Sequence, residues 1–166
     1  MVALAFQILF PLLVIYAAIT DLFTMTIPNR ISLLLVGGFA GSAVLVGLAP
    51  YDLLLHAACG LSVLAVGFIM FAFGWIGGGD AKLAAATALW IGSEQLAEYI
   101  LTAALCGGVL TLAILSLRSV PLPAVALGWD WLTRLHDRRS GVPYGVALAG
   151  AALLVYPTTA FWKAAF

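Results

Sequence analysis

Charged residues are scarce in this sequence of 166 residues, and their scarcity excludes a water-soluble globule. Only 8% of the residues are charged, against roughly a quarter in a typical soluble domain. Hydrophobic residues make up 64%, and the mean hydropathy is +1.16. Because so little polar surface is available, most of the chain must face lipid. Residues 1–166 are therefore expected to form one membrane domain, with no room for a sizeable soluble one.

Excess charge of either sign and paired cysteines are also lacking. Seven basic and seven acidic residues give a net charge of zero, and no Lys/Arg cluster with interleaved aromatics occurs, so a nucleic-acid partner is not expected. The two cysteines, Cys59 and Cys106, lie singly in apolar runs, without a CxxC motif or a His/Cys cluster. The sequence thus predicts neither a metal site nor a disulfide framework, and no cofactor.

What is present is a series of long apolar runs. A membrane-spanning helix needs about 20 mostly apolar residues. Five runs reach or approach that length, and a sixth, at 81–91, is shorter. The pattern predicts an all-α, polytopic membrane protein with six transmembrane helices, at residues 2–20, 31–49, 53–76, 81–91, 99–117 and 144–162.

The basic residues predict how these helices are oriented, because cytoplasmic loops are enriched in Lys and Arg. Six of the seven basic residues fall in the loops after the first, third and fifth helices, and only Lys163 falls on the other side. The N-terminus is therefore expected outside the cell, and the loop at 118–141 in the cytoplasm. Leu127, Trp131, Leu132 and Leu135 have helical spacing in this loop, which suits either an interfacial helix or a plain connection.

Three tryptophans support this layout. Trp75, Trp90 and Trp162 all fall near the ends of expected helices. Amphipathic rings favour the headgroup region of the bilayer, so we expect these three side chains at the membrane interfaces.

Asp21 ends the first expected helix, on the cytoplasmic side. A juxtamembrane carboxylate in contact with water is the simplest interpretation. A helix C-terminus, however, carries a partial negative charge that disfavours an aspartate. Either another group compensates or the helix continues past residue 20. Pro28 biases Ile27 towards an extended conformation, so a turn is expected soon after Asp21.

Asp80 opens the short fourth helix, also on the cytoplasmic side, directly after Gly77, Gly78 and Gly79. Aspartate is a good helix cap, and capping alone would explain it. Three consecutive glycines at membrane depth, however, cost conformational entropy and supply no packing. They suit a backbone that takes unusual angles or approaches another backbone closely. A short, interrupted helix beside an acidic residue is also a common feature of binding sites in membrane proteins.

Taken together, the two aspartates suggest a dyad. Two neighbouring carboxyls share a proton, so one can activate a water while the other assists the substrate carbonyl. This chemistry hydrolyses peptides without a metal. His56, predicted outside, and His136, in the long loop, offer no competing catalytic set.

The order of these motifs resembles the type IV prepilin peptidase family, the bacterial GxGD aspartic proteases. Asp21 is followed by Ile27-Pro28-Asn29, then by Gly77-Gly78-Gly79-Asp80-Ala81-Lys82, and Val142-Pro143-Tyr144-Gly145 resembles the family's Pro-aromatic-Gly stretch. The resemblance covers nearly the whole chain. It implies that Asp21 and Asp80 are catalytic. The other site residues it implies have access or shaping roles: Gly77, Gly78, Gly79, Pro28, Asn29, Lys82, Pro143, Tyr144 and Gly145.

The resemblance also implies a substrate and a location. The partner would be a prepilin or pseudopilin in the lipid membrane, cut on the cytoplasmic side of the bacterial inner membrane. Larger family members carry an added cytoplasmic domain with paired cysteines that accompanies N-methylation. Here the loop after the first helix has no cysteine, so the chain looks like the short peptidases of tight-adherence pilus systems, and methyl transfer is not expected.

Two other functions fit the residues alone. A small transporter could use Asp80 in a proton or cation path, although it would call for polar positions in both halves of the membrane. A structural subunit of a secretion complex could use both aspartates merely as caps.

Overall fold

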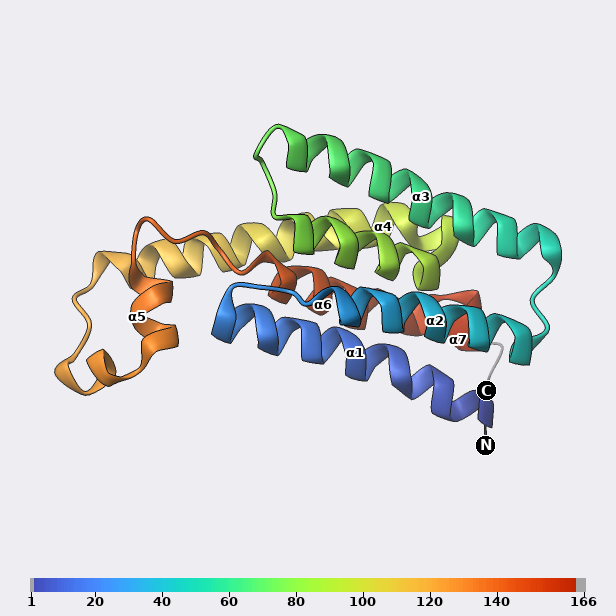
Figure 1. Cartoon of the computed structure of the whole chain (residues 1–166), viewed down its shortest axis with the longest axis horizontal. Coiled ribbons are helices and arrows are strands. Elements are labelled where there is room, and N and C mark those ends of the chain that lie inside the picture. The colour runs from blue at the N-terminus through green and yellow to red at the C-terminus, as the bar shows by residue number, and fades with distance from the viewer. Residues whose placement is uncertain (1, 164–166) are drawn as a thin grey trace.

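A computed structural model describes residues 2–163, and these residues contain helices and turns but no strand. The longer helices are α1 (Val2–Thr24), α2 (Asn29–Val46), α3 (Pro50–Ala72), α4 (Gly78–Ser119) and α6 (Tyr144–Val155). Shorter elements occupy the C-terminal third: η1 (Ala124–Gly128), α5 (Asp130–His136), η2 (Tyr156–Thr158) and α7 (Ala160–Lys163). Figure 1 shows the longer helices lying roughly side by side in an elongated bundle.

The helices α2, α3 and α4 are long and apolar enough to cross a membrane, and shorter apolar helices occupy Ile8–Thr24 and Tyr144–Thr158. Large apolar side chains cover their outer surfaces, among them Leu33, Leu61, Phe68, Leu105 and Leu112. An apolar exterior on apolar helices is what lipid demands of a spanning protein. The expectation of an all-α, polytopic membrane protein is confirmed.

The fourth and fifth expected helices are two legs of α4. Gly92 has φ 76° and ψ 179°, a conformation that breaks the helix and that residues with a side chain rarely adopt. Figure 1 shows the chain doubling back there. A non-helical connection was expected between the helices at 81–91 and 99–117. This expectation is wrong, because Gly92 alone makes the turn and the second leg of α4 begins immediately after it.

The last expected helix, 144–162, is also interrupted. α6 ends at Val155, and a 3-10 turn and the short α7 follow. Pro157 lacks the N–H that a continuing α-helix needs. Thr159 then adopts an extended conformation, and its hydroxyl accepts a hydrogen bond of 3.1 Å from the N–H of Trp162. This side-chain bond satisfies an N–H at the start of α7.

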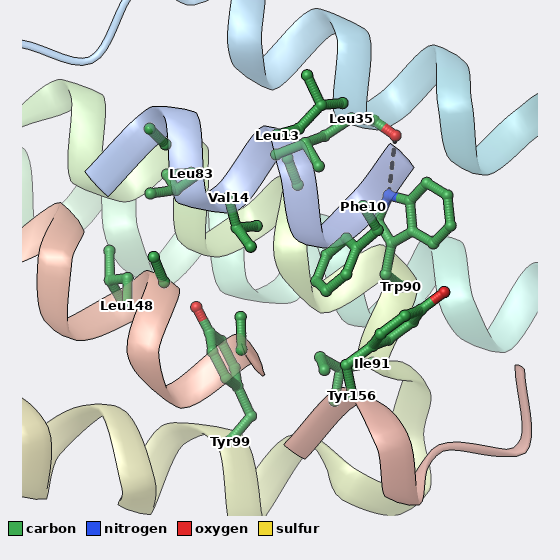
Figure 2. Packing of buried hydrophobic residues seen from close by; sticks show 14 of the residues in the cluster. Phe10, Leu13, Val14, Leu35, Leu83, Trp90, Ile91, Tyr99, Leu148 and Tyr156 are labelled. Atoms are coloured by element: carbon green, nitrogen blue, oxygen red, sulfur yellow. Dashed lines mark hydrogen bonds between the residues drawn. The ribbon is translucent and has the colours of Figure 1, made fainter. Parts of the chain in front are cut away.

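An aromatic cluster fills the middle of the bundle (Figure 2). The Trp90 ring lies 5.1 Å from Phe10, and Phe10 lies 4.3 Å from Tyr156, centroid to centroid. Trp90 is fully buried, and its indole N–H donates to the Leu35 carbonyl at 2.9 Å. The expected interfacial position of Trp90 is thus wrong, because the Gly92 turn brings the end of the first leg into the core. Trp75, by contrast, is 72% exposed.

The long loop folds back against the bundle. The Arg118 guanidinium donates to three carbonyls, those of Leu135, Ser140 and Gly141. The short α5 meets the end of α1, where Trp131 packs edge-on against Phe23 and Arg134 donates to the Phe23 carbonyl at 3.1 Å. Of the two interpretations left open for this loop, a short helix is therefore correct as local structure.

Candidate active site

Asp21 lies in the last turn of α1, since that helix continues to Thr24 rather than ending at residue 20. Met25 then takes φ 54°, the left-handed conformation, and its N–H bonds to the Asp21 carbonyl at 2.8 Å. This geometry closes the helix and turns the chain at once. The turn expected after Asp21 is confirmed, whereas the water-exposed position is wrong, because the side chain is only 5% exposed.

The N-terminus of α6 compensates the unfavourable position of Asp21. The Gly145 N–H donates a hydrogen bond of 2.7 Å to Asp21 Oδ2. Gly145 is the second residue of α6, where backbone N–H groups lack partners within the helix and carry partial positive charge. The negative end of α1 is therefore offset by the positive end of α6, across 124 positions of sequence.

Gly145 must be a glycine for this contact. A Cβ atom there would lie 2.8 Å from Asp21 Oδ2 and 2.7 Å from Ile27 Cδ1. Real Cβ atoms do not approach so closely, and Gly145 is buried. The absence of a side chain is what allows the α6 backbone to approach the carboxyl.

Asp80 lies at the start of α4, close to the N-cap residue Gly77. Its Oδ2 atom lies 2.8 Å from the point where a Cβ on Gly77 would be, so the carboxyl reaches back over the first turn of the helix. An acidic side chain that reaches back to the N-cap is one half of a capping box. Asp80 is thus placed where an aspartate can cap a helix, and the capping interpretation stays a prediction. It does not exclude chemistry, because a cap needs only one of the two carboxyl oxygens.

Ile27 joins the two aspartates, and the sequence did not mark it as a site residue. Ile27 is 9% exposed, and it contacts Gly79, which precedes Asp80, and Gly145, which bonds to Asp21. A Cβ on Gly79 would lie 3.1 Å from Ile27 Cβ, just as one on Gly145 would touch its Cδ1. The surroundings of the two carboxyls are therefore in contact with the same side chain. In the sequence, the one feature that could have indicated Ile27 is its apolar side chain within a mainly polar turn.

The Ile27-Pro28-Asn29 turn is fastened to the start of α4. Lys82 Nζ donates to Asn29 Oδ1 at 2.9 Å, so its ammonium pairs with an amide and not with Asp80. Pro28 is the extended N-cap residue of α2, with φ −61° and ψ 138°. Two of the motifs quoted from the sequence are therefore in direct contact.

Pro143 and Tyr144 fix the start of α6. Pro143 is the buried N-cap residue, and the Tyr144 hydroxyl reaches towards the Ala103 carbonyl at 3.5 Å on the second leg of α4. The Tyr144 ring occupies the space that a Cβ on Gly107 would need. Tyr144 thus ties the start of α6, whose Gly145 N–H bonds to Asp21, to the second leg of α4.

A cavity of about 350 Å³ opens beside Asp80. It lies between α3, the two legs of α4 and α6, and its walls are mainly apolar, with Val66, Met70, Ile100 and Leu148 among them. Tyr99 and Tyr144 also line it. Such a cavity can receive an apolar chain with its end at the Asp80 carboxyl. Within residues 2–163, no group of three or more His, Cys, Asp or Glu residues is placed to hold a metal ion.

Fold and site together define a polytopic helical membrane protein with two carboxyls brought together at one end of its bundle. Comparison with known proteins is consistent with this class: the type IV leader peptidase family matches residues 8–112. The chain belongs to that family. It is also 30% identical, over 150 residues, to the prepilin leader peptidase/N-methyltransferase of Bacillus subtilis (strain 168).

The match to the Bacillus subtilis protein covers 90% of this chain but only 54% of the relative. The chain thus spans about half the length of that protein. No solved structure gives a significant match.

Proposed function

We propose that this protein is an aspartic endopeptidase that removes the leader peptide of prepilins or pseudopilins. The observation that carries the proposal is the convergence of Asp21 and Asp80, from α1 and α4, around Ile27 and beside an apolar cavity. Membership of the leader peptidase family favours this function over a transporter or a structural subunit.

The geometry suits a proton-sharing pair. The Gly145 N–H holds one oxygen of Asp21, and Asp80 Oδ2 lies close to Gly77. The other oxygen of each carboxyl remains to share a proton, and Asp80 can bind the attacking water. The ionised carboxyl takes a proton from the water as it attacks the scissile carbonyl. The protonated carboxyl donates to the carbonyl oxygen, and the leaving amine finally receives a proton.

The two carboxyls have different roles in this mechanism. Asp80 lines the cavity, whereas Asp21 is nearly inaccessible behind Gly145 and Ile27. Asp80 is therefore the carboxyl that meets the substrate, and Asp21 shares its proton from behind. The apolar cavity would take the hydrophobic segment that follows the cleavage site of a prepilin, leaving the scissile bond at Asp80.

A purified sample with a prepilin provides the direct test. We expect one cut that separates the leader from the apolar segment, observed by intact-mass spectrometry. Added S-adenosylmethionine should not increase the product mass by a methyl group. The reason is that the short α1–α2 connection of this chain lacks the cysteine-containing insertion found in the larger family members. An uncut prepilin with a well-folded protein would contradict the proposed activity.

The proposed orientation, with the site facing the cytoplasm of the bacterial inner membrane, has its own test. Thr26 and Ser93 are both exposed. Thr26 lies next to Ile27, which contacts Gly79 at the start of α4, and Ser93 follows the Gly92 turn at the other end of the first leg. Single cysteines are placed at these two positions after replacement of Cys59 and Cys106. Because basic residues favour the cytoplasm, position 93 should react with an impermeant thiol reagent added outside cells, and position 26 only after lysis. Labelling of position 26 in intact cells would reverse the orientation.

A further inference from the structure

A second hollow lies on the other side of the first leg of α4, away from the Asp80 cavity. Helices α2 and α3 both pack on α4 but make almost no contact with each other. In Figure 1 the first leg of α4 runs between them. The space left open is a groove of about 600 Å³ lined by all three helices, with the exposed side chains of Leu33 and Leu61 among its walls. In a bilayer, such a groove must be filled by something other than water.

Each of the three helices contributes one regular stripe to the groove. The lining residues follow an i, i+3, i+4, i+7 pattern, which is one face of a helix. They are Asn29, Ser32, Leu33 and Val36 from α2, Ala57, Gly60, Leu61 and Leu64 from α3, and Lys82, Ala85, Ala86 and Leu89 from α4. Seven residues of helix span about 10 Å, so the groove is deep enough for the upper part of an acyl chain.

The polar groups of the groove all lie at one end. Asn29 and Lys82 belong to the first turns of α2 and α4 and are joined by their hydrogen bond. Ser32 lies one turn further in, and its hydroxyl, on a side chain 9% exposed, has no partner among the described residues. No carboxyl lines the groove. Its mouth is therefore cationic and hydrogen-bonding, and its depth is apolar.

We propose that this groove binds a membrane phospholipid with an anionic headgroup, taken from the leaflet at the Asp21/Asp80 end of the bundle. The Lys82 ammonium would attract the headgroup, and an acyl chain would lie along Leu33, Leu61 and Leu89. Basic pockets between transmembrane helices are recognised sites for anionic lipid headgroups. The inference rests on the membrane fold and the groove, and it is independent of the proposed peptidase activity.

Lipid retention by the purified protein tests the site. Delipidated protein in detergent is mixed with phosphatidylglycerol or phosphatidylcholine of the same acyl chains, and bound lipid is counted by native mass spectrometry. The wild type should retain more phosphatidylglycerol. Lys82→Gln removes the charge but keeps an N–H donor for Asn29, so it should weaken phosphatidylglycerol retention about fivefold and abolish the preference. Leu61→Trp should fill the groove and reduce the retention of both lipids.

Leu105→Trp is the matched control, since Leu105 is 72% exposed, as Leu61 is 66% exposed, but lies outside the groove. It should leave retention unchanged. Thermal stability in detergent checks folding, and Leu33→Trp replaces Leu61→Trp if the latter is unstable. Equal retention of both lipids by the wild type would overturn the proposal. The proposal would also be overturned if Leu105→Trp reduced lipid retention as much as Leu61→Trp does. A loss of prepilin binding in the groove variants, with their lipid retention unchanged, would overturn it as well.

Discussion

Asp21→Asn and Asp80→Asn should each abolish leader cleavage, with a fall in rate of roughly 10² to 10⁴-fold or more. Asparagine has nearly the same shape as aspartate but cannot accept and return a proton. The amide oxygen introduced by Asp21→Asn could still accept the Gly145 N–H, which now holds Asp21 at 2.7 Å, so the fold should survive. The rate is measured by following loss of the prepilin leader in detergent.

The double variant and a distant variant sharpen this prediction. Because a proton-sharing pair acts as one unit, Asp21→Asn with Asp80→Asn should be scarcely slower than either single variant. Asp52→Asn changes a carboxylate in the first turn of α3, which belongs to neither motif, and should process at a nearly normal rate. Normal processing by either single variant at 21 or 80 would show that the carboxyls do not work as a pair.

The second large effect is expected from one methyl group. Gly145→Ala places a Cβ 2.8 Å from Asp21 Oδ2 and 2.7 Å from Ile27 Cδ1, so the Asp21 carboxyl and the Ile27 side chain, or the helix ends that carry them, must move. A displacement of about 1 Å at a catalytic group can cost about 10²-fold in rate. Overpacking of this kind typically costs about 1–3 kcal/mol in stability. We therefore expect an inserted, somewhat less stable protein with cleavage reduced by about 10²-fold.

Gly150→Ala separates this effect from a general change in α6. Gly150 lies in the same helix, and a Cβ there meets nothing within 4 Å. Alanine also favours a helix more than glycine does, so Gly150→Ala should keep full activity and equal or higher thermal stability. If Gly145→Ala cleaved prepilin as fast as Gly150→Ala, the hydrogen bond from α6 would not be needed to hold Asp21.

The two aspartates illustrate how far a sequence can locate a site. The charge distribution predicted that both lie at the same end of the helices, and the glycine run marked Asp80 as unusual. The family resemblance included Gly145 among the site residues, but the sequence could not indicate that Gly145 holds Asp21, because the bond comes from a backbone N–H, which every residue except proline possesses. Ile27 was missed for a related reason: its importance lies in its contacts with Gly79 and Gly145 and not in its chemistry.

The sequence by itself determined the solvent and the class of fold, since these depend on properties summed over many residues. An apolar composition requires lipid, and runs of about 20 apolar residues require helices that satisfy their own backbone hydrogen bonds. Tertiary structure alone decided that Gly92 turns α4 back, that Trp90 lies in the core, and that α6 brings its N-terminus to Asp21. The physical reason is that these contacts join residues far apart in the chain. Which of them form depends on how whole helices pack, and no local pattern records it.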